Sequence, residues 1–444
     1  MAIFEEIREY DLITFNPDYK ERDGYTYVDE SVFNCIVEFI HEFNGSNTQA
    51  DAIDFLKCFT KKNIGDVISA QNYVGLIQTR HGHQIQILPK IDFSVSKDKA
   101  QISHDTRRIF LKMLRSMKDF PGKVFNDATM SVDRMNLYEM FIHMYLQDVR
   151  QLVKNGLKSA YIKKEENLPY YKGKLLVNQN IKQNLVHKER FYVSYDEYSI
   201  NRPENRLIKS TLLKLLNLTG NSENAKMSRQ LLASFEMVDI STNFEKDFTR
   251  VVIDRTTKDY EKLMKWSRVI LFNKSFKTFS GESQSRALLF PMESVYENYV
   301  AQKVKKAFIP EGWSVKTQER GFYLFEEPTK QFALRPDIVM RKGNRTVIMD
   351  TKWKTLIDNP ARNYGISQSD MYQMYAYSKK YRTPEIWLLY PITNEMRNHE
   401  RIRYKAANGS EMETDVNVFF IDLTADDIRE DSFKKLALEV IDGD

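Results

Sequence analysis

The sequence is poor in cysteine and has no long apolar run. Its two cysteines are too few for a disulfide framework or a four-cysteine zinc site, so Cys35 and Cys58 are expected to be ordinary buried thiols. No stretch of about 18 apolar residues is available to cross a bilayer. The acidic beginning, MAIFEEIREYDL, lacks the basic-then-apolar order of a signal peptide. We therefore expect a cytoplasmic protein without a membrane partner.

Charge is abundant but nearly balanced. The 66 basic and 61 acidic residues leave a net charge of +5, which by itself says little about a nucleic-acid partner. The segment from Arg150 to Arg190, however, has ten Lys or Arg against three Glu and includes Tyr161, Tyr170 and Tyr171. This composition suits phosphate contact with aromatic support, and it is equally typical of a solvated helix face and loop. Both interpretations remain open.

Length and composition predict an α/β multidomain protein. A chain of 444 residues exceeds the size of one hydrophobic core, and 42% hydrophobic with 29% charged residues is a globular mixture. We predict an N-terminal α/β domain (1–100), a helix-rich middle domain (101–280) and a C-terminal domain (281–444). The polar segment 273–284 interrupts the apolar periodicity and marks the second boundary.

The N-terminal region shows a mixed pattern. A helix is predicted over Ser31 to Phe43, and the segment from Tyr73 to Lys90 has two alternating runs separated by His-Gly-His, which is typical of a β-hairpin. His81 and His83 could bind a metal by residue type. A plain turn is favoured, because no carboxylate or thiolate partner lies nearby in the sequence.

Helical periodicity dominates the middle region. Apolar residues recur at three- and four-residue spacing from Leu137 to Tyr145, which predicts an amphipathic helix. Further helices are predicted after Pro203, over 224–238 and over 247–272.

The last third of the chain alternates between helical and strand-like patterns. A helix is predicted over 291–307, strand-like runs over 313–317, 321–325, 332–340 and 346–353, a second helix over 367–380 and a strand over 385–390. This order predicts a mixed sheet flanked by helices.

Charged residues interrupt two of these predicted strands. Asp350 and Lys352 are two apart and so leave the same face of one strand, while Asp337 lies in the preceding strand-like run. Burying them in an apolar hairpin is costly unless they pair or bind a cation. Asp337 and Asp350 suit Mg²⁺, and Lys352 could position a nucleophilic water during phosphodiester hydrolysis. The structural alternative is a hairpin whose charges face solvent.

The two flanking helices offer further candidates. Glu293 and Glu297 share one helix face, and either could add a third metal-binding carboxylate; we favour Glu297. Gln373 and Tyr377 point the same way on the second helix and could reach a DNA backbone or the lysine. The nearby Tyr372 and Tyr375 are expected to serve packing.

These residues resemble the PD-(D/E)xK nuclease superfamily. The correspondence consists of Pro336-Asp337, Asp350-x-Lys352, the earlier Glu297, and the later Gln373-x-x-x-Tyr377, an element typical of the RecB-like branch. Within the superfamily the chain looks most like the McrC family. The similar segments cover most of the chain and include YVGLIQTRHGHQIQILPKI, NGLKSAY, YKGKLL, YDEYSINRPENRLIK, FPMESVYENYV and SDMYQMYAY. Trp353 stands where tyrosine is commoner.

The resemblance implies a function and a partner. McrC proteins are Mg²⁺-dependent DNA endonuclease subunits of McrBC-type restriction complexes, which act in defence against foreign, methylated double-stranded DNA. They dock through their N-terminal region on McrB, a hexameric AAA+ GTPase, and stimulate it. The present sequence has no G-x-x-x-x-G-K-[ST] loop, so any nucleotide-driven step must come from such a partner. The alternatives are a non-cleaving activator of an AAA+ motor and a stand-alone repair or RNA nuclease.

Overall fold

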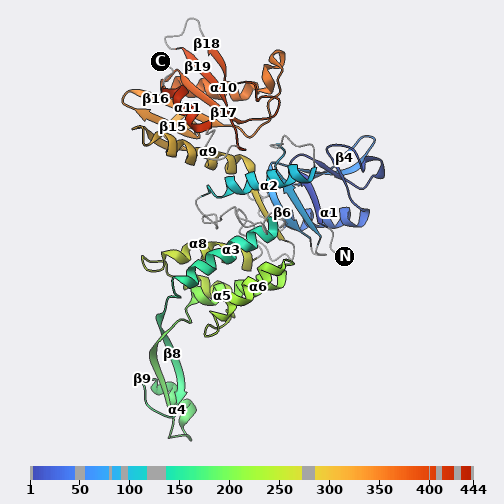
Figure 1. Ribbon diagram of the computed structural model, residues 1–444. Coiled ribbons are helices and arrows are strands. Elements are labelled where there is room, and N and C mark those ends of the chain that lie inside the picture. Colours follow the sequence, from blue (N-terminus) through green and yellow to red (C-terminus); the bar gives the residue numbers. More distant parts are fainter. Residues whose placement is uncertain are drawn as a thin grey trace. The chain divides into compact units, whose positions relative to one another are not determined.

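The computed structural model describes residues 4–45, 56–79, 83–91, 99–117, 137–272, 286–399, 401–406, 413–424 and 432–441 (Figure 1). They form two compact units: unit 1 combines residues 1–118 with 287–444, and unit 2 spans residues 119–286. This division differs from the three predicted domains, whose boundaries remain a prediction, because it groups the N-terminal segment with the C-terminal one. The predicted linker 273–284 and His81 lie outside the described residues.

The N-terminal part of unit 1 contains two small sheets. The first has the order β1 (Phe4–Arg8), β7 (Gln84–Leu88), β6 (Tyr73–Gln78) and β11 (Arg286–Pro291); the second has the order β3 (Tyr25–Tyr27), β2 (Leu12–Thr14), β5 (Gly65–Ala70) and β4 (Leu56–Lys61). Helices α1 (Glu30–Gly45) and α2 (Lys99–Leu114) belong to the same part. The predicted N-terminal helix is confirmed by α1, and the predicted hairpin by the antiparallel pair β6 and β7.

Strand β11 joins the two ends of unit 1. It lies beside β6 in the N-terminal sheet, and the chain runs from it directly into α9 (Met292–Phe308). The backbone N–H of Met292 donates to the carbonyl of Asn72 at 3.0 Å. Leu289 of β11 belongs to an apolar core that also includes Ile7 of β1 and Ile36 of α1. The N-terminal sheet therefore fixes where α9 begins.

The prediction of two buried cysteines is wrong. Cys35 on α1 is half-buried and Cys58 on β4 is exposed. Strand β4 is at the edge of its sheet, and every residue of it after Leu56 is exposed. On α1 the core is contacted by Val32, Phe33 and Ile36 instead.

A six-stranded mixed sheet forms the C-terminal part of unit 1. Its order is β12 (Ser314–Thr317), β15 (Ile338–Lys342), β16 (Arg345–Thr351), β17 (Glu385–Pro391), β19 (Thr414–Ile421) and β18 (Arg401–Ala406). Strand β17 is parallel to β16 and to β19, and the other neighbours are antiparallel. This agrees with the predicted mixed sheet.

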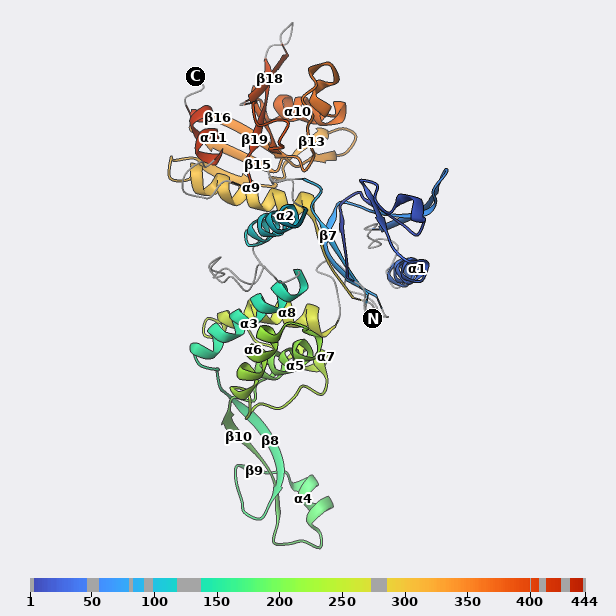
Figure 2. The same cartoon turned by 45° about the vertical axis from the view of Figure 1, so that its right-hand side comes forward.

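Helices cover both faces of the sheet. Tyr377 of α10 (Gln368–Tyr381) packs with Ile348 of β16 on one face. Because side chains alternate along a strand, Val347 points to the other face. There α9 packs against β16, and α11 (Ser432–Ile441) lies against α9 (Figure 2).

One predicted strand is split in two. The run 332–340 forms β14 (Gln331–Leu334) and β15, which belong to different sheets. Pro336 lies between them and lacks the N–H that a continuous ladder would need. Strand β14 pairs with β13 (Phe322–Phe325) in a separate hairpin. Asp337 therefore stands at the beginning of β15.

Unit 2 is a group of helices with a projecting arm. The helices are α3 (Leu137–Lys154), α5 (Pro203–Leu218), α6 (Ser222–Ala233), α7 (Phe244–Thr249) and α8 (Lys258–Leu271). The arm consists of β8 (Ala160–Leu168), β9 (Lys174–Leu175), α4 (Val177–Asn184) and β10 (Phe191–Ser199), and both views show it extending from the helices (Figures 1 and 2). None of the helices that the structure describes is long and apolar enough to cross a membrane.

The middle region was predicted correctly only in part. Its helices are confirmed, but the strands of the arm were not predicted. The single helix expected over 247–272 is wrong, because α7 and α8 are separate helices. Between them, the carboxylate of Asp254 accepts hydrogen bonds from the backbone N–H groups of Thr256 and Thr257 at 2.7 and 3.0 Å, and this turn interrupts the helical backbone.

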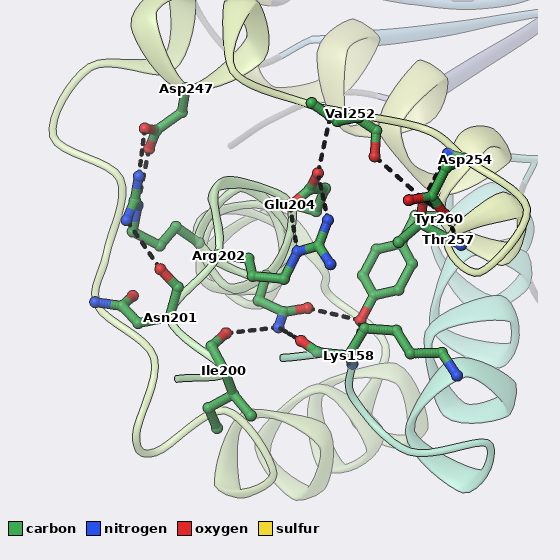
Figure 3. A network of polar contacts seen from close by, with 12 residues as sticks. Lys158, Ile200, Asn201, Arg202, Glu204, Asp247, Val252, Asp254, Thr257 and Tyr260 are labelled. Carbon is green, nitrogen blue, oxygen red and sulfur yellow. Dashed lines mark hydrogen bonds and ion pairs between the residues drawn. The ribbon is translucent and has the colours of Figure 1, made fainter. Parts of the chain in front are cut away.

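Buried polar side chains fix the base of the arm (Figure 3). Asn205 of α5 donates to the carbonyls of Lys158, just before β8, and Ile200, just after β10, at 3.2 and 2.6 Å. The hydroxyl of Tyr260 on α8 donates to the side-chain oxygen of Asn205 at 2.9 Å. The carboxylate of Glu204, which is 1% exposed, accepts the backbone N–H of Val252. The arm therefore starts from a well-anchored base.

Candidate functional site

The predicted acidic residues meet where β15 begins and β16 ends. Ile338, the first residue of β15, pairs with Met349 of β16 in an antiparallel register. The preceding Asp337 is therefore opposite Asp350, one position further along β16. Side chains opposite each other on antiparallel strands leave the same face and lie close together. The fold thus brings two carboxylates from separate strands to one place.

Asp337 is held by the neighbouring Thr351. The backbone N–H and the hydroxyl of Thr351 both donate to Oδ2 of Asp337, at 2.7 and 2.6 Å. Burial raises the pKa of Asp337 above its ordinary value, although the hydrogen bonds from Thr351 and the charge of Lys352 lower it. The carboxylate is therefore fixed in position but poorly compensated in charge.

Asp350 is the more deeply buried carboxylate. Its exposed fraction is 2%. Burial, followed by the negative charge of Asp337, raises the pKa of Asp350 to about 7, and Lys352 opposes the shift. The Nζ atom of Lys352 lies 2.7 Å from Oδ2 of Asp350 as an ion pair. Even with this pair, the two facing carboxylates leave the site short of positive charge.

Lys352 is fixed from both ends. Its backbone N–H donates to the carbonyl of Leu389 at 3.0 Å. Its ammonium donates to Oε1 of Gln373 at 2.9 Å, and Nε2 of Gln373 donates to the hydroxyl of Tyr377 at 2.7 Å. Burial lowers the pKa of Lys352, but the charge of Asp350 and the other carboxylates outweighs this effect and the net shift is upward. The ammonium therefore stays charged, and the Gln-x-x-x-Tyr element of α10 orients it.

Glu297 lies next to this group and Glu293 is less well placed. Glu297 on α9 is half-buried and accepts a hydrogen bond from Nε2 of Gln318 at 2.8 Å. Burial and the charge of Asp337 raise the pKa of Glu297 to about 7, and the hydrogen bond from Gln318 lowers it. Glu293 is exposed, although its charge still reaches Asp337. Glu297 is the better candidate for a third carboxylate.

Sequence reasoning missed Asp370, which lies beside the lysine. This residue of α10 is 6% exposed, and its carboxylate oxygens lie 3.7 Å from Nζ of Lys352 and 2.7 Å from Nζ of Lys354. Burial raises the pKa of Asp370, but hydrogen bonds from Lys354 and Ser367 and the charges of both lysines bring it below the ordinary value. Asp370 is therefore an ionised partner of both lysines.

The remaining sequence candidates do not join this group. Tyr372 and Tyr375 were expected to pack, but they are 65% and 47% exposed. Among the residues that the structure describes, no three His, Cys, Asp or Glu side chains are already arranged to hold a metal ion, and this includes His83. A metal at Asp337 and Asp350 would therefore need water molecules to complete its coordination.

The basic segment lies on the arm of unit 2. Tyr161 of β8 and Tyr198 of β10 are 74% and 65% exposed, and their ring centroids are 5.2 Å apart. Nζ of Lys172 lies 3.8 Å from the ring centroid of Tyr195. The segment is thus a surface with aromatic and basic side chains. Such a surface is compatible both with phosphate contact and with a plain solvated surface. Phosphate contact remains a prediction.

Comparisons with known proteins point to one family. Residues 68–391 match a family model described as McrBC 5-methylcytosine restriction system component. The structure is similar to a chain of the Thermococcus gammatolerans half-complex of McrB AAA+ hexamers with bound McrC. The TM-score is 0.67 at 18% identity, over 99% of this chain and 100% of that chain. A chain of the Thermococcus gammatolerans McrBC complex aligns with a TM-score of 0.47 at 17% identity, over 69% of this chain and 88% of that chain. No curated protein matches the sequence.

Proposed function

Because the chain belongs to the McrBC family of restriction-system components, we propose that it is the DNA-cleaving subunit of such a complex. The reaction is Mg²⁺-dependent hydrolysis of phosphodiester bonds in foreign, methylated DNA. The observation that carries the proposal is the group formed by Asp337, Asp350 and Lys352 at the ends of β15 and β16. A buried carboxylate, a half-buried one and a charged lysine at the ends of two paired strands are the parts that a PD-(D/E)xK nuclease requires.

Asp337 and Asp350 fit the needs of Mg²⁺. This hard cation takes carboxylate oxygens and keeps several waters, so two carboxylates are sufficient without a complete protein cage. Burial raises the pKa of both residues, and a cation between them would relieve that unfavourable charge. Glu297 is the candidate third ligand. When bound, the ion supplies a water of lowered pKa and positive charge beside the phosphate.

The protein's own residues supply orientation and charge. Lys352 presents a permanently charged ammonium to a phosphate and its attacking water, and this favours the negative charge that develops in the transition state. Gln373 and Tyr377 hold the ammonium by a hydrogen-bonded chain that adds no charge. Thr351 keeps Asp337 in place with two hydrogen bonds. Most of this arrangement exists before substrate binds, as catalysis by positioning requires.

A hexameric AAA+ GTPase of the McrB type is the proposed partner. The chain shares its fold over nearly its whole length with a chain from a complex of McrB AAA+ hexamers with bound McrC. Its sequence has no P-loop motif, so nucleotide hydrolysis has to come from another protein. The β6–β7 hairpin is the candidate docking element. The exposed basic and aromatic arm is a second candidate for contact with the ring or with DNA.

Two alternatives make different predictions. A non-cleaving activator of an AAA+ motor would have no reason to keep Asp337, Asp350 and Lys352 together in a buried site. A stand-alone repair or RNA nuclease would cleave without a partner and would be expected to stack bases on aromatic side chains. The observed group of acids and lysine favours cleavage, and the family favours a partner.

Cleavage of methylated duplex DNA tests the proposal. The purified chain is assayed with its motor partner, Mg²⁺ and GTP, alongside Asp350→Ala, Asp337→Ala and the matched control Asp358→Ala, an exposed carboxylate of the same unit. We expect the two site variants to lose cleavage but still stimulate GTP hydrolysis, and the control to cut normally. Continued cleavage by Asp350→Ala would refute the site assignment. Equal cleavage by the wild type without the partner would favour the stand-alone nuclease.

A further inference from the structure

A buried carboxylate outside the candidate site connects the N-terminal sheet to the segment that carries Lys352. Glu9 follows β1 and is 2% exposed. Its Oε2 accepts hydrogen bonds from the indole Nε1–H of Trp353 at 3.0 Å and from the backbone N–H of Lys90 at 3.1 Å. Oε1 has no hydrogen-bond partner among the described residues.

Both N-terminal sheets hold the backbone around Glu9. The N–H of Glu9 donates to the carbonyl of Leu88 on β7, and the N–H of Tyr10 donates to the carbonyl of Ala70 on β5, each at 2.9 Å. Tyr10 has a φ of 69°, in the left-handed region that residues other than glycine rarely adopt. Such a conformation persists only where the surrounding structure enforces it. The direction of the Glu9 side chain is therefore set by the fold.

Trp353 contacts two segments of the proposed nuclease site. It follows Lys352 in the chain and is 3% exposed. Because the N–H of Lys352 continues the ladder to Leu389, neighbouring side chains leave opposite sides, so Trp353 reaches Glu9 while Lys352 reaches Asp350. The indole centroid is also 5.3 Å from the ring of Tyr296, which precedes Glu297 on α9.

A carboxylate at this place is not explained by packing. Burial raises the pKa of Glu9 to about 7, against the hydrogen bonds from Trp353 and Lys90 and the charge of Lys90, and the charge of Glu293 adds to the rise. A buried polar group with an unpaired oxygen is unfavourable compared with an apolar residue of similar size. Its use lies in the strong, directed acceptor that it offers to the indole.

We infer that Glu9 is a positioning residue for the nuclease site, which fixes the indole of Trp353 and thereby the backbone that presents Lys352 to Asp350. The inference rests on the proposed nuclease function and adds a role for the N-terminal sheet. Strand β7, which holds Glu9, is also part of the candidate docking hairpin. If a partner displaced that hairpin, the hydrogen bond between Glu9 and Trp353 would transmit the displacement to Lys352.

The test compares cleavage kinetics of the complete complex for variants along this connection. Glu9→Leu removes the acceptor and Trp353→Phe removes the donor, and each should lower kcat about tenfold, because small displacements of a catalytic group reduce rate strongly. KM for DNA should stay within about twofold, since neither residue belongs to the candidate site. Glu9→Gln keeps an oxygen that can accept both N–H groups and should restore cleavage.

Two control variants separate a positioning role of Glu9 from a general destabilisation of the N-terminal sheet. Glu6→Gln removes an exposed charge from the same strand but keeps an acceptor for the side-chain N–H of Gln86, and Ile7→Val weakens the packing of the same sheet. Both should cut like the wild type. Normal cleavage by Glu9→Leu or Trp353→Phe, an equal loss in Ile7→Val, or no rescue by Glu9→Gln would each overturn the inference.

A second readout does not depend on cleavage. The indole N–H resonance of Trp353, assigned by its loss in Trp353→Phe, should lie downfield in the wild type and in Glu9→Gln and move upfield in Glu9→Leu. An unchanged resonance in Glu9→Leu would refute the contact itself. A wild-type complex that cuts no DNA would instead refute the proposed function, so the two failures are distinguishable.

Discussion

Replacing Asp350 with asparagine should stabilise the metal-free protein at pH 8 while abolishing cleavage. Asp350 is 2% exposed, and its pKa is raised from 3.8 to about 7 by burial and by the charge of Asp337. At pH 8 the folded protein therefore carries an ionised group in a place that favours the neutral form. Asparagine has nearly the same shape without the charge. The variant should therefore lack the free-energy cost of a buried, ionised carboxylate.

The magnitude follows from the shift. A group whose pKa is higher in the folded state than in the unfolded state binds protons more tightly when folded, so stability falls as pH rises through that interval. A rise from 3.8 to about 7 corresponds to about 4 kcal/mol at pH 8, at 1.36 kcal/mol for each pKa unit. At about pH 4.5 only about 1 kcal/mol of this difference should remain.

The assay is denaturant unfolding in EDTA at pH 4.5, 6 and 8, with Glu311→Gln as the exposed control. The stability gap between Asp350→Asn and the wild type should grow with pH, while the control shows no such trend. Adding Ca²⁺ at pH 8 should stabilise the wild type and not the variant, since only the wild type offers both carboxylates. A variant no more stable than the wild type at pH 8, or a gap independent of pH, would show that the reasoning about Asp350 is wrong.

Two further predictions concern Asp370 and the arm. Asp370→Asn removes a partner that lies 3.7 Å from the ammonium of Lys352; it should lower kcat about tenfold and leave Mg²⁺ affinity unchanged in calorimetry, and a loss of affinity would contradict the assigned role. Gly173 has a φ of +69°, and a Cβ there would lie 2.4 Å from the carbonyl oxygen of Ser194. Gly173→Ala should therefore detach β9 and speed tryptic cleavage near Lys172 and Lys174, and an unchanged digest would contradict this.

The acid-and-lysine group could be predicted because its signal is local. Alternation along one strand places Asp350 and Lys352 on the same face, and the helical spacing of Gln373 and Tyr377 aligns them. Asp370 could not be singled out from the sequence, because the spacing Ser367-x-x-Asp370 is also typical of a helix N-terminus; the hydroxyl of Ser367 does accept the N–H of Asp370 at 3.2 Å. The contacts of Asp370 with the two lysines depend on the tertiary structure, which the local sequence does not show.

Long-range pairing and exposed strands could not be predicted. Nothing near β11 indicates that it pairs with β6, because the two strands are far apart in the sequence. The arm strands β8 and β10 bury few residues and so lack the apolar alternation that identifies a half-buried strand. The grouping of the N-terminal segment with the C-terminal sheet depends on these non-local contacts.

Cleavage by two matched lysine variants tests the central claim most directly. Lys352 and Lys354 both pair with Asp370, but only Lys352 also pairs with Asp350. In the complete complex with Mg²⁺, GTP and methylated DNA, Lys352→Met should lose cleavage by at least about a hundredfold, and Lys354→Met should stay within about tenfold of the wild type. Cleavage by Lys352→Met at the wild-type rate would contradict the assignment of this site as the nuclease centre.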